Sequence, residues 1–239
     1  MNGGGRSIRR VGGGGALLAL IVASALWLWP AVGSGAIVSV SVLDNMFDPK
    51  TASFEVLLSD DPNVRFDWDG IGDDTTKNKH NVKSNARLFK SGKPTDTRSP
   101  YEVQFSAGKF PYHCKVHRDS DNMKGKVKIA PLATDHILIK DKAGTGKGAG
   151  EESAKVHWAT ETTTTGTKFD VQFRVDGKKW KGWKNNTRKF RARFGKNAKP
   201  RSVDFDAHTY EVRARSEKGK PSKRKRSRWS PPETVNPFM

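Results

Sequence analysis

The sequence contains one cysteine, Cys114, and one long apolar run, residues 16–29, in a chain of 239 residues. A single cysteine excludes a framework of disulfides within the chain. A single apolar run excludes a protein that crosses a membrane several times. Carboxylates are scarce relative to cations, because 25 Asp and Glu accompany 44 Lys and Arg, for a net charge of +19. No arrangement of Ser, His and Asp stands out, so nothing favours a hydrolase, and we predict that the protein is not an enzyme.

The apolar run has the organisation of an export signal. Three arginines precede it, a proline ends it and a stretch of small residues follows. This order is typical of a secretory signal, whereas a membrane-spanning helix needs about 20 apolar residues. We therefore predict a signal peptide over residues 1–36, cleaved after Ala36, with retention as a membrane anchor as the alternative. The protein would then work outside the cytoplasm, in the extracellular space, the cell envelope or the periplasm.

The basic excess divides the rest of the chain into two regions. Residues 37–131 hold 15 basic and 13 acidic residues, whereas residues 132–239 hold 26 basic and 12 acidic residues. We expect one domain in each region, and we expect the interactions of the second domain to be dominated by its positive charge.

Residues 37–131 have the pattern of short β-strands. Apolar and polar residues alternate over 38–42, 64–68, 101–105 and 127–129, and turn-rich pieces separate these runs. A period of two is typical of strands with one buried face, and no stretch shows a helical period. The pattern predicts an antiparallel β-sandwich of about 95 residues.

Four residues with soft donor atoms fall within this pattern: His80, Cys114, His117 and Met123. A thiolate, two imidazoles and a thioether suit copper that cycles between two oxidation states, whereas zinc favours four strong ligands. A lone Cys or Met is more often a buried apolar side chain. The signal therefore lies in the combination of Cys-x-x-His with Met-x-Gly-x-Val a few residues later.

Several short motifs accompany these residues: Phe-Asp-Pro at 47–49, His-Asn-Val at 80–82, Phe-Lys-Ser-Gly at 89–92, Phe-Pro-Tyr-His-Cys-Lys-Val-His at 110–117 and Met-Lys-Gly-Lys-Val at 123–127. Together they resemble the plastocyanin-like cupredoxins, which are small blue-copper proteins. The resemblance covers residues 37–131 and implies a Greek-key sandwich that holds one type 1 copper. It implies His80, Cys114 and His117 as equatorial ligands and Met123 as the weak axial ligand.

The residues around these ligands carry further expectations. The resemblance implies that Asn81 ties the two ligand loops together through its side chain. His113 precedes Cys114 in a strand, where neighbours point to opposite faces, so we expect it to face away from the copper. His117 lies on the most surface-prone loop and is our candidate for the route of the electron to a partner. A positive rim around the metal would favour an acidic partner and would consist of Lys115, Arg118 and Lys124.

Residues 132–239 repeat the alternating pattern and contain several tryptophans. We expect strands near 136–139, 156–158, 169–175, 190–194 and 209–215, and a flexible loop at the Gly-rich residues 143–150, which lack the ending of a phosphate loop. The strand order and the segments at 210–215 and 229–232 resemble a fibronectin type III domain. The resemblance implies an immunoglobulin-like sandwich with a tyrosine corner at Tyr210. It also places in the core Trp158, Tyr210 and Trp229.

The positive charge of the second region raises the hypothesis of polyanion binding. Trp180 and Trp183, which flank an expected bend, could stack on nucleic-acid bases if they are exposed. The export signal disfavours nucleic acid as the target, so a cell-wall polyanion or an anionic membrane surface is the better candidate. A solvated basic surface without a ligand explains the same pattern.

The sequence therefore predicts an exported blue-copper protein that transfers single electrons between redox partners and carries a C-terminal interaction module. One alternative is a surface-binding or adhesive protein whose first domain has lost its redox role, which the intact set of four ligands disfavours. A second alternative is a copper storage or delivery protein on a cupredoxin scaffold.

Overall fold

The computed structural model describes residues 37–44, 46–56, 63–70, 79–96, 99–139, 151–161, 163–195, 203–205 and 207–235. The expected signal peptide and the Gly-rich segment 143–150 lie outside these residues. The described elements are strands, apart from one short 3₁₀-helix, η1 (Pro221–Lys223). This confirms the predicted all-β fold. Within the described part of the chain, no helix is long and apolar enough to cross a membrane.

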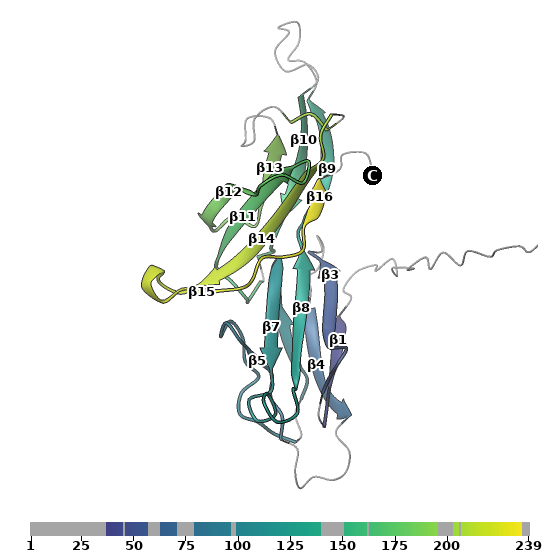
Figure 1. Ribbon diagram of the computed structural model, residues 1–239, viewed down its shortest axis with the longest axis vertical. Helices are drawn as coiled ribbons and strands as arrows, with labels where there is room; N and C mark the ends of the chain where they lie inside the picture. Colours follow the sequence, from purple (N-terminus) through teal and green to yellow (C-terminus); the bar gives the residue numbers. More distant parts are fainter. Residues whose placement is uncertain are drawn as a thin grey trace, which may run out of the picture. The chain divides into compact units, whose positions relative to one another are not determined.

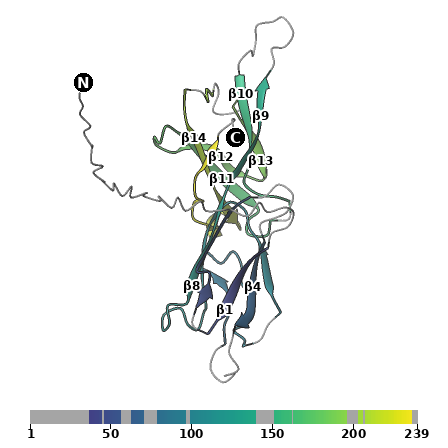
Figure 2. The same cartoon turned by 90° about the vertical axis from the view of Figure 1, so that its right-hand side faces the viewer.

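The first region forms two four-stranded sheets. Its strands are β1 (Val38–Leu43), β2 (Phe47–Asp48), β3 (Thr51–Glu55), β4 (Asn63–Gly70), β5 (Lys83–Ser84), β6 (Tyr101–Gln104), β7 (Gly108–His113) and β8 (Lys124–Ala130). One sheet has the order β2-β1-β4-β6 and the other β3-β8-β7-β5. Figure 1 shows β5, β7, β8 and β3 of the second of these sheets, and Figure 2 shows β1 beside β4 of the first. The expectation of a purely antiparallel sandwich is wrong, because β1 with β4 and β3 with β8 pair in parallel. Alternation reports which face is buried but not the direction of a neighbouring strand.

Aromatic side chains fill the space between these sheets and fix the strand that leads to the cysteine. The rings of Phe47 and Phe66 lie edge-on to Tyr112 of β7, at centroid distances of 4.9 and 5.2 Å. All three side chains are buried. Burying one large apolar side chain contributes about 1.5–3 kcal/mol, so this cluster holds β7 firmly up to Cys114.

The second region also forms two sheets. Its strands are β9 (Leu132–Ile139), β10 (Glu151–His157), β11 (Lys168–Val175), β12 (Lys181–Thr187), β13 (Arg191–Gly195), β14 (Tyr210–Lys218), β15 (Lys225–Arg226) and β16 (Glu233–Val235). One sheet has the order β13-β10-β9 and the other β12-β11-β14-β15, with β16 also paired to β14. All of these pairs are antiparallel.

The core of the second region contains a tryptophan that we expected at a bend. β12 begins at Lys181 and includes Trp183, so the expected bend between Trp180 and Trp183 is wrong. The side chain of Trp183 is only 6% exposed and packs edge-on against Trp158 and Phe194, with centroid distances of 5.7 and 5.0 Å. Its burial removes Trp183 from the residues that could stack on a nucleic-acid base.

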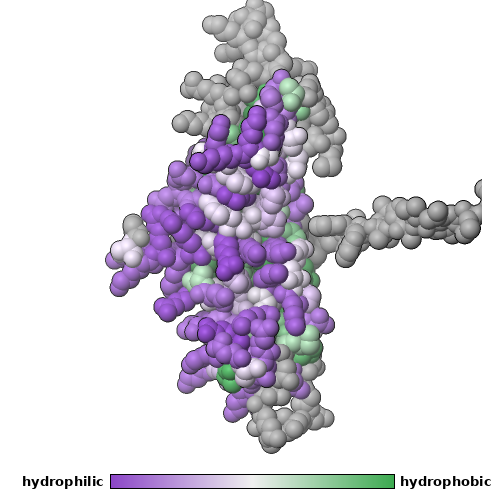
Figure 3. Space-filling view, viewed as in Figure 1, coloured by the Kyte–Doolittle hydropathy of each residue, from purple (hydrophilic) through white to green (hydrophobic). Residues whose placement is uncertain are grey.

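Arginines and tryptophans alternate on the outer face of the β11–β14 sheet and form what we call the arginine–tryptophan ladder. Its members are Arg174, Trp180, Arg213, Trp229 and Arg215. The guanidinium of Arg213 lies 4.1 Å from the ring centre of Trp180 and 4.8 Å from that of Trp229. The expectation that Trp229 belongs to the core is wrong. Its side chain is half-buried and lies against Arg213 and Arg215. These arginines point outward from β14, because the residues on either side of them in the strand are buried. Figure 3 shows hydrophilic residues over much of the viewed face.

Two of the expected core residues occupy the predicted positions. Trp158 is fully buried, and its Nε1–H donates a hydrogen bond to the carbonyl of Lys189 at 2.7 Å. Tyr210 is 4% exposed, and its hydroxyl accepts a hydrogen bond from the amide of Asp204 at 3.1 Å. A hydroxyl bonded to the backbone a few residues upstream is the contact that defines a tyrosine corner.

Hydrogen bonds join the two regions next to the start of β7. The buried hydroxyl of Ser106 contacts the hydroxyls of Thr165 and Ser216. Lys109 and Arg228 exchange two backbone hydrogen bonds of 3.0 Å. The second region therefore anchors the beginning of the strand whose end leads to Cys114.

Candidate metal centre

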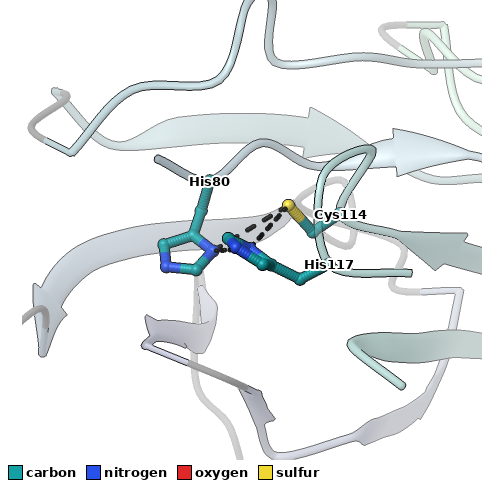
Figure 4. Close-up of side chains that lie close together, drawn as sticks. All are labelled: His80, Cys114 and His117. Carbon is teal, nitrogen blue, oxygen red and sulfur yellow. Dashed lines mark hydrogen bonds between the residues drawn. The ribbon is translucent and has the colours of Figure 1, made fainter. Parts of the chain in front are cut away.

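Three of the four predicted ligands come together in the first region (Figure 4). The sulfur of Cys114 lies 3.8 Å from Nδ1 of His80 and 3.7 Å from Nδ1 of His117. The two Nδ1 atoms are 3.1 Å apart. Cys114 and His80 are fully buried, and His117 is 9% exposed. Two residues of one loop and one residue from a distant hairpin therefore point their donor atoms at the same place.

The spacing of these atoms fits one bound metal ion. Metal–nitrogen and metal–sulfur bonds of about 2.0–2.3 Å place two ligands of one ion about 3–4 Å apart. The three observed separations, from 3.1 to 3.8 Å, lie in that range. One thiolate with two imidazoles is also a donor set that suits copper. The residues present thus fit a copper ion in both spacing and chemistry.

His80 stands at the base of a hairpin, residues 80–95, which we call the ligand hairpin. His80 and Thr95 exchange backbone hydrogen bonds of 2.8 and 2.9 Å. Farther along, the amide of Val82 donates to Oγ of Ser91, and the amide of Ser91 donates to the carbonyl of Val82. The motifs at 80–82 and 89–92 are therefore the two arms of one hairpin.

Asn81 connects the ligand hairpin to the loop that carries Cys114. Its Nδ2 donates to the carbonyl of Gly92 at 3.0 Å, and its Oδ1 accepts from the amide of Lys115 at 2.8 Å. Lys115 directly follows Cys114, so the side chain of Asn81 fixes the distance between the two ligand-bearing segments. This is the connection that the sequence led us to expect of Asn81.

The loop from Cys114 to Met123 is closed by its own backbone. The amide of Cys114 donates to the carbonyl of Met123 at 3.1 Å, and the amide of Met123 donates to the carbonyl of His117 at 3.0 Å. Asn122 adopts a left-handed conformation with φ of 52°, which asparagine tolerates better than most residues. The backbone of Met123 thus lies beside Cys114 and its side chain is 1% exposed. Its role as axial ligand stays a prediction.

A glycine two residues after Met123 allows the loop to join the sheet. Gly125 lies opposite Tyr112 in the pairing of β7 with β8. A Cβ atom at Gly125 would overlap the ring of Tyr112. The glycine of the Met-x-Gly-x-Val motif is therefore required by the close approach of the tyrosine ring.

His113 takes no part in the cluster. Its Nδ1 lies 2.6 Å from Oδ1 of Asn85, to which it donates a hydrogen bond. Burial first, and then the positive charges of Arg118 and Lys83, lower the pKa of His113. A neutral imidazole bonded to Asn85 agrees with the expectation that His113 faces away from the metal.

The environment of His80 keeps its imidazole able to bind a metal. Burial, followed by the nearby His117, lowers the pKa of His80 from 6.5 to about 4. The ring is therefore neutral at neutral pH, and the nitrogen that faces the cluster needs no deprotonation before it binds an ion. Nε2 of His80 is buried without a hydrogen-bond partner among the described residues.

The surface over the site carries less positive charge than the sequence suggested. Lys115, Arg118 and Lys124 are exposed as expected. Arg118, however, forms an ion pair of 2.9 Å with Asp119, and both side chains are exposed. Val116, between the two loop ligands, is 52% exposed. The rim therefore combines two lysines that form no ion pair with a described residue, Lys115 and Lys124, with an apolar contact point.

Comparisons with known proteins add little to this description. No protein-family model matches the sequence. No match was found among the curated proteins. Among solved structures, the chain resembles an oxidized mutant of amicyanin, with 20% identity, 41% of this chain and 87% of that chain covered, and a TM-score of 0.29. The interpretation of the site rests on its own donor atoms and their spacing.

Proposed function

We propose that the protein binds one copper ion through His80, Cys114 and His117, with Met123 as the weak axial ligand, and transfers single electrons outside the cytoplasm. The observation that carries this proposal is the buried thiol within 3.8 Å of two imidazole nitrogens. Bound copper supplies a couple between two oxidation states that differ by one electron.

The surrounding residues support electron transfer because they hold the donor atoms in place. Asn81 joins the two ligand-bearing segments, and the backbone bonds between Cys114, His117 and Met123 close the loop. Ligands fixed in this way move little when the oxidation state changes, so little reorganisation opposes the transfer. Hydrogen bonds around the cysteine sulfur and the nature of the axial ligand then tune the reduction potential.

We infer that the electron leaves through His117. This side chain is the most exposed of the three clustered donors, and its loop presents Val116 to solvent. An apolar contact at Val116, flanked by the cations of Lys115 and Lys124, favours a redox partner with an acidic rim around an apolar centre.

For the second region we propose an interaction module of the fibronectin type III kind. Two antiparallel sheets, β13-β10-β9 and β12-β11-β14, and the tyrosine corner at Tyr210 support this assignment. Its basic surface would hold the copper domain near a cell-wall polyanion or an anionic membrane. The excess of cations in residues 132–239 supports that role.

Redox cycling tests electron transfer against copper storage or delivery. The copper-loaded full chain is reduced, reoxidised and passed over a desalting column for several cycles. We expect reversible electrochemistry with one copper retained per chain. Loss of copper on each reduction would contradict the proposal and favour delivery.

Met123→Leu tests the axial position separately. Removing the thioether should leave copper bound and raise the reduction potential, because a weak donor that stabilises the oxidised state is lost. Unchanged electrochemistry would remove Met123 from the site.

A further inference from the structure

A cationic cavity lies between the tip of the ligand hairpin and the hairpin formed by β14 and β15. Its volume is about 640 Å³, within the range of about 300–1,000 Å³ that is typical of small-molecule sites. No carboxylate is among the described residues that line it. Five of its lining side chains are cations: Lys83, Arg87, Lys90, Lys218 and Lys225.

Four of these cations form two like-charged pairs across neighbouring strands. Lys83 lies opposite Lys90 within the ligand hairpin, and Lys218 lies opposite Lys225 between β14 and β15. Like charges directly opposite each other destabilise a strand pair. No described carboxylate forms an ion pair with any of the four. Two uncompensated lysine pairs therefore face one cavity from separate parts of the chain.

At the neighbouring position in the pairing of β14 with β15, a carboxylate balances the positive charge of two arginines. Glu217 lies opposite Arg226 and forms ion pairs with Arg226 at 2.5 Å and with Arg224 at 3.1 Å. Glu217 is buried, so both arginines have a fixed counter-charge. Lys218 and Lys225 lie one register position away and have no counter-charge among the described residues.

Arg87 adds a fifth cation at a position that does not favour arginine. Its φ of 58° lies in the left-handed region, where glycine or asparagine is less strained. The amide of Arg87 donates to the carbonyl of Ser84, which closes the turn at the tip of the ligand hairpin. The turn geometry thus gains nothing from an arginine side chain, and Arg87 is one of the residues that line the cavity.

We propose that this cavity binds a compact, multiply charged anion, of the kind that oligophosphates and tricarboxylates represent. Lysine and arginine donate strong, charge-assisted hydrogen bonds to phosphate and carboxylate oxygens. The buried side chains of Leu88 and Phe89 give the cavity an apolar floor. A concave site between two hairpins fits a compact anion better than an extended polymer, which would need its cations in a row along a surface. The site needs no copper and is independent of the proposed electron transfer.

Calorimetric titration of the full chain with inorganic triphosphate tests the proposal. The experiment is run at low ionic strength without added metal, and citrate replaces triphosphate in a second arm. We compare the wild type with Lys218→Gln/Lys225→Gln and with the matched control Lys179→Gln/Lys189→Gln, which removes two exposed lysines outside the cavity. We expect one triphosphate per chain, binding weakened about tenfold or more by the cavity variant, and nearly unchanged binding in the control.

The outcomes distinguish a specific anion-binding site from nonspecific attraction by the positive charge of the protein. Binding of triphosphate or citrate that depends on the cavity lysines supports the proposal and identifies the anion group preferred. Equal weakening in both double variants, or no binding by the wild type, would overturn it. Retention of heparin alone, without binding of either compact anion, would overturn it in favour of an extended polymer.

Thermal unfolding of the same variants checks whether the lysines have a structural role instead. The two lysines of each pair repel each other. Without ligand, Lys218→Gln/Lys225→Gln should therefore have a melting temperature equal to or above that of the wild type. A clear fall would show that the lysines stabilise the fold, and would contradict the proposal. Lys90→Gln tests the other hairpin in the same way if the double variant does not fold.

Discussion

The donor cluster of the first region is buried, whereas the arginine–tryptophan ladder of the second region lies on an outer face. In the first region His80, Cys114 and His117 are inside the sandwich, where hydrogen bonds to neighbouring segments hold them. In the second region the arginine–tryptophan ladder stands on an outer face, where Arg213 is stacked between Trp180 and Trp229. We therefore expect substitutions at the supports of the buried site to cost more stability than substitutions in the partly exposed ladder.

The largest expected effect comes from crowding the first region beside its site. Gly125→Ala would drive a methyl group into the ring of Tyr112, and we expect the free energy of unfolding to fall by about 3 kcal/mol. The matched substitution in the second region is Gly182→Ala, where the nearest atoms lie at an ordinary 3.5 Å. It should change stability little. Chemical denaturation of both variants measures the difference, and equal costs would contradict the contrast between the regions.

The second prediction concerns the connection between the ligand-bearing segments. Asn81→Ala leaves the amide of Lys115 without its acceptor in a closely packed setting, which should cost about 2 kcal/mol of stability. Because the distance between His80 and Cys114 is then less fixed, copper affinity should fall as well. The exposed Asn185 provides the control variant, Asn185→Ala. If copper affinity is unchanged in Asn81→Ala, the connection does not support the site.

Much of the candidate site could be predicted from the sequence because its supports are local. The side chain of Asn81 donates a hydrogen bond to the carbonyl of Gly92 within one hairpin, and Gly125 is required by one tyrosine ring, so each leaves a short motif. The sulfur position of Met123 depends on side-chain packing and was not determined by any motif. The role of Met123 as axial ligand therefore stays a prediction.

Less of the second region could be predicted. Alternation located the strands β11 and β14, but Trp183 and Trp229 lie outside these two strands, so it carried no information on their burial. Trp183 proved to be buried, which excludes the hypothesis that it stacks on a base, and Trp229, which we expected in the core, proved to be stacked on arginines. The cationic cavity was also not predicted, because it joins residues that are more than 120 positions apart in the sequence.

The third prediction tests whether stacking holds the outer face of the second region. Arg213→Lys keeps the charge but loses the planar group that lies between two rings and bonds to Gln172. We expect a loss of about 1 kcal/mol, because a lysine stacks less well than an arginine. Arg191→Lys, at an exposed position of β13, should cost nothing measurable. A stable Arg213→Lys would show that charge alone suffices in the ladder.

The smallest expected effect is a pH dependence at the edge of the second region. Burial, and next the charge of Glu55, raise the pKa of Glu233 from 4.5 to about 7. The folded protein therefore keeps a proton that the unfolded chain has lost, and this contribution to stability is complete below pH 4.5 and is lost as the pH rises through 7. Glu233→Gln should raise the melting temperature at pH 8 more than at pH 5. An equal shift at both values, or the same behaviour in the exposed control Glu161→Gln, would contradict this assignment.

The most direct test of the copper site is a titration of the full chain with Cu(II), followed by visible absorption and electron paramagnetic resonance. We predict saturation at one copper per chain, an intense band from thiolate to copper and a narrow hyperfine splitting. Cys114→Ser should remain folded and lose the intense band. A pale wild-type product, or an intense band that survives in Cys114→Ser, would contradict the assignment of His80, Cys114 and His117 as a blue-copper centre.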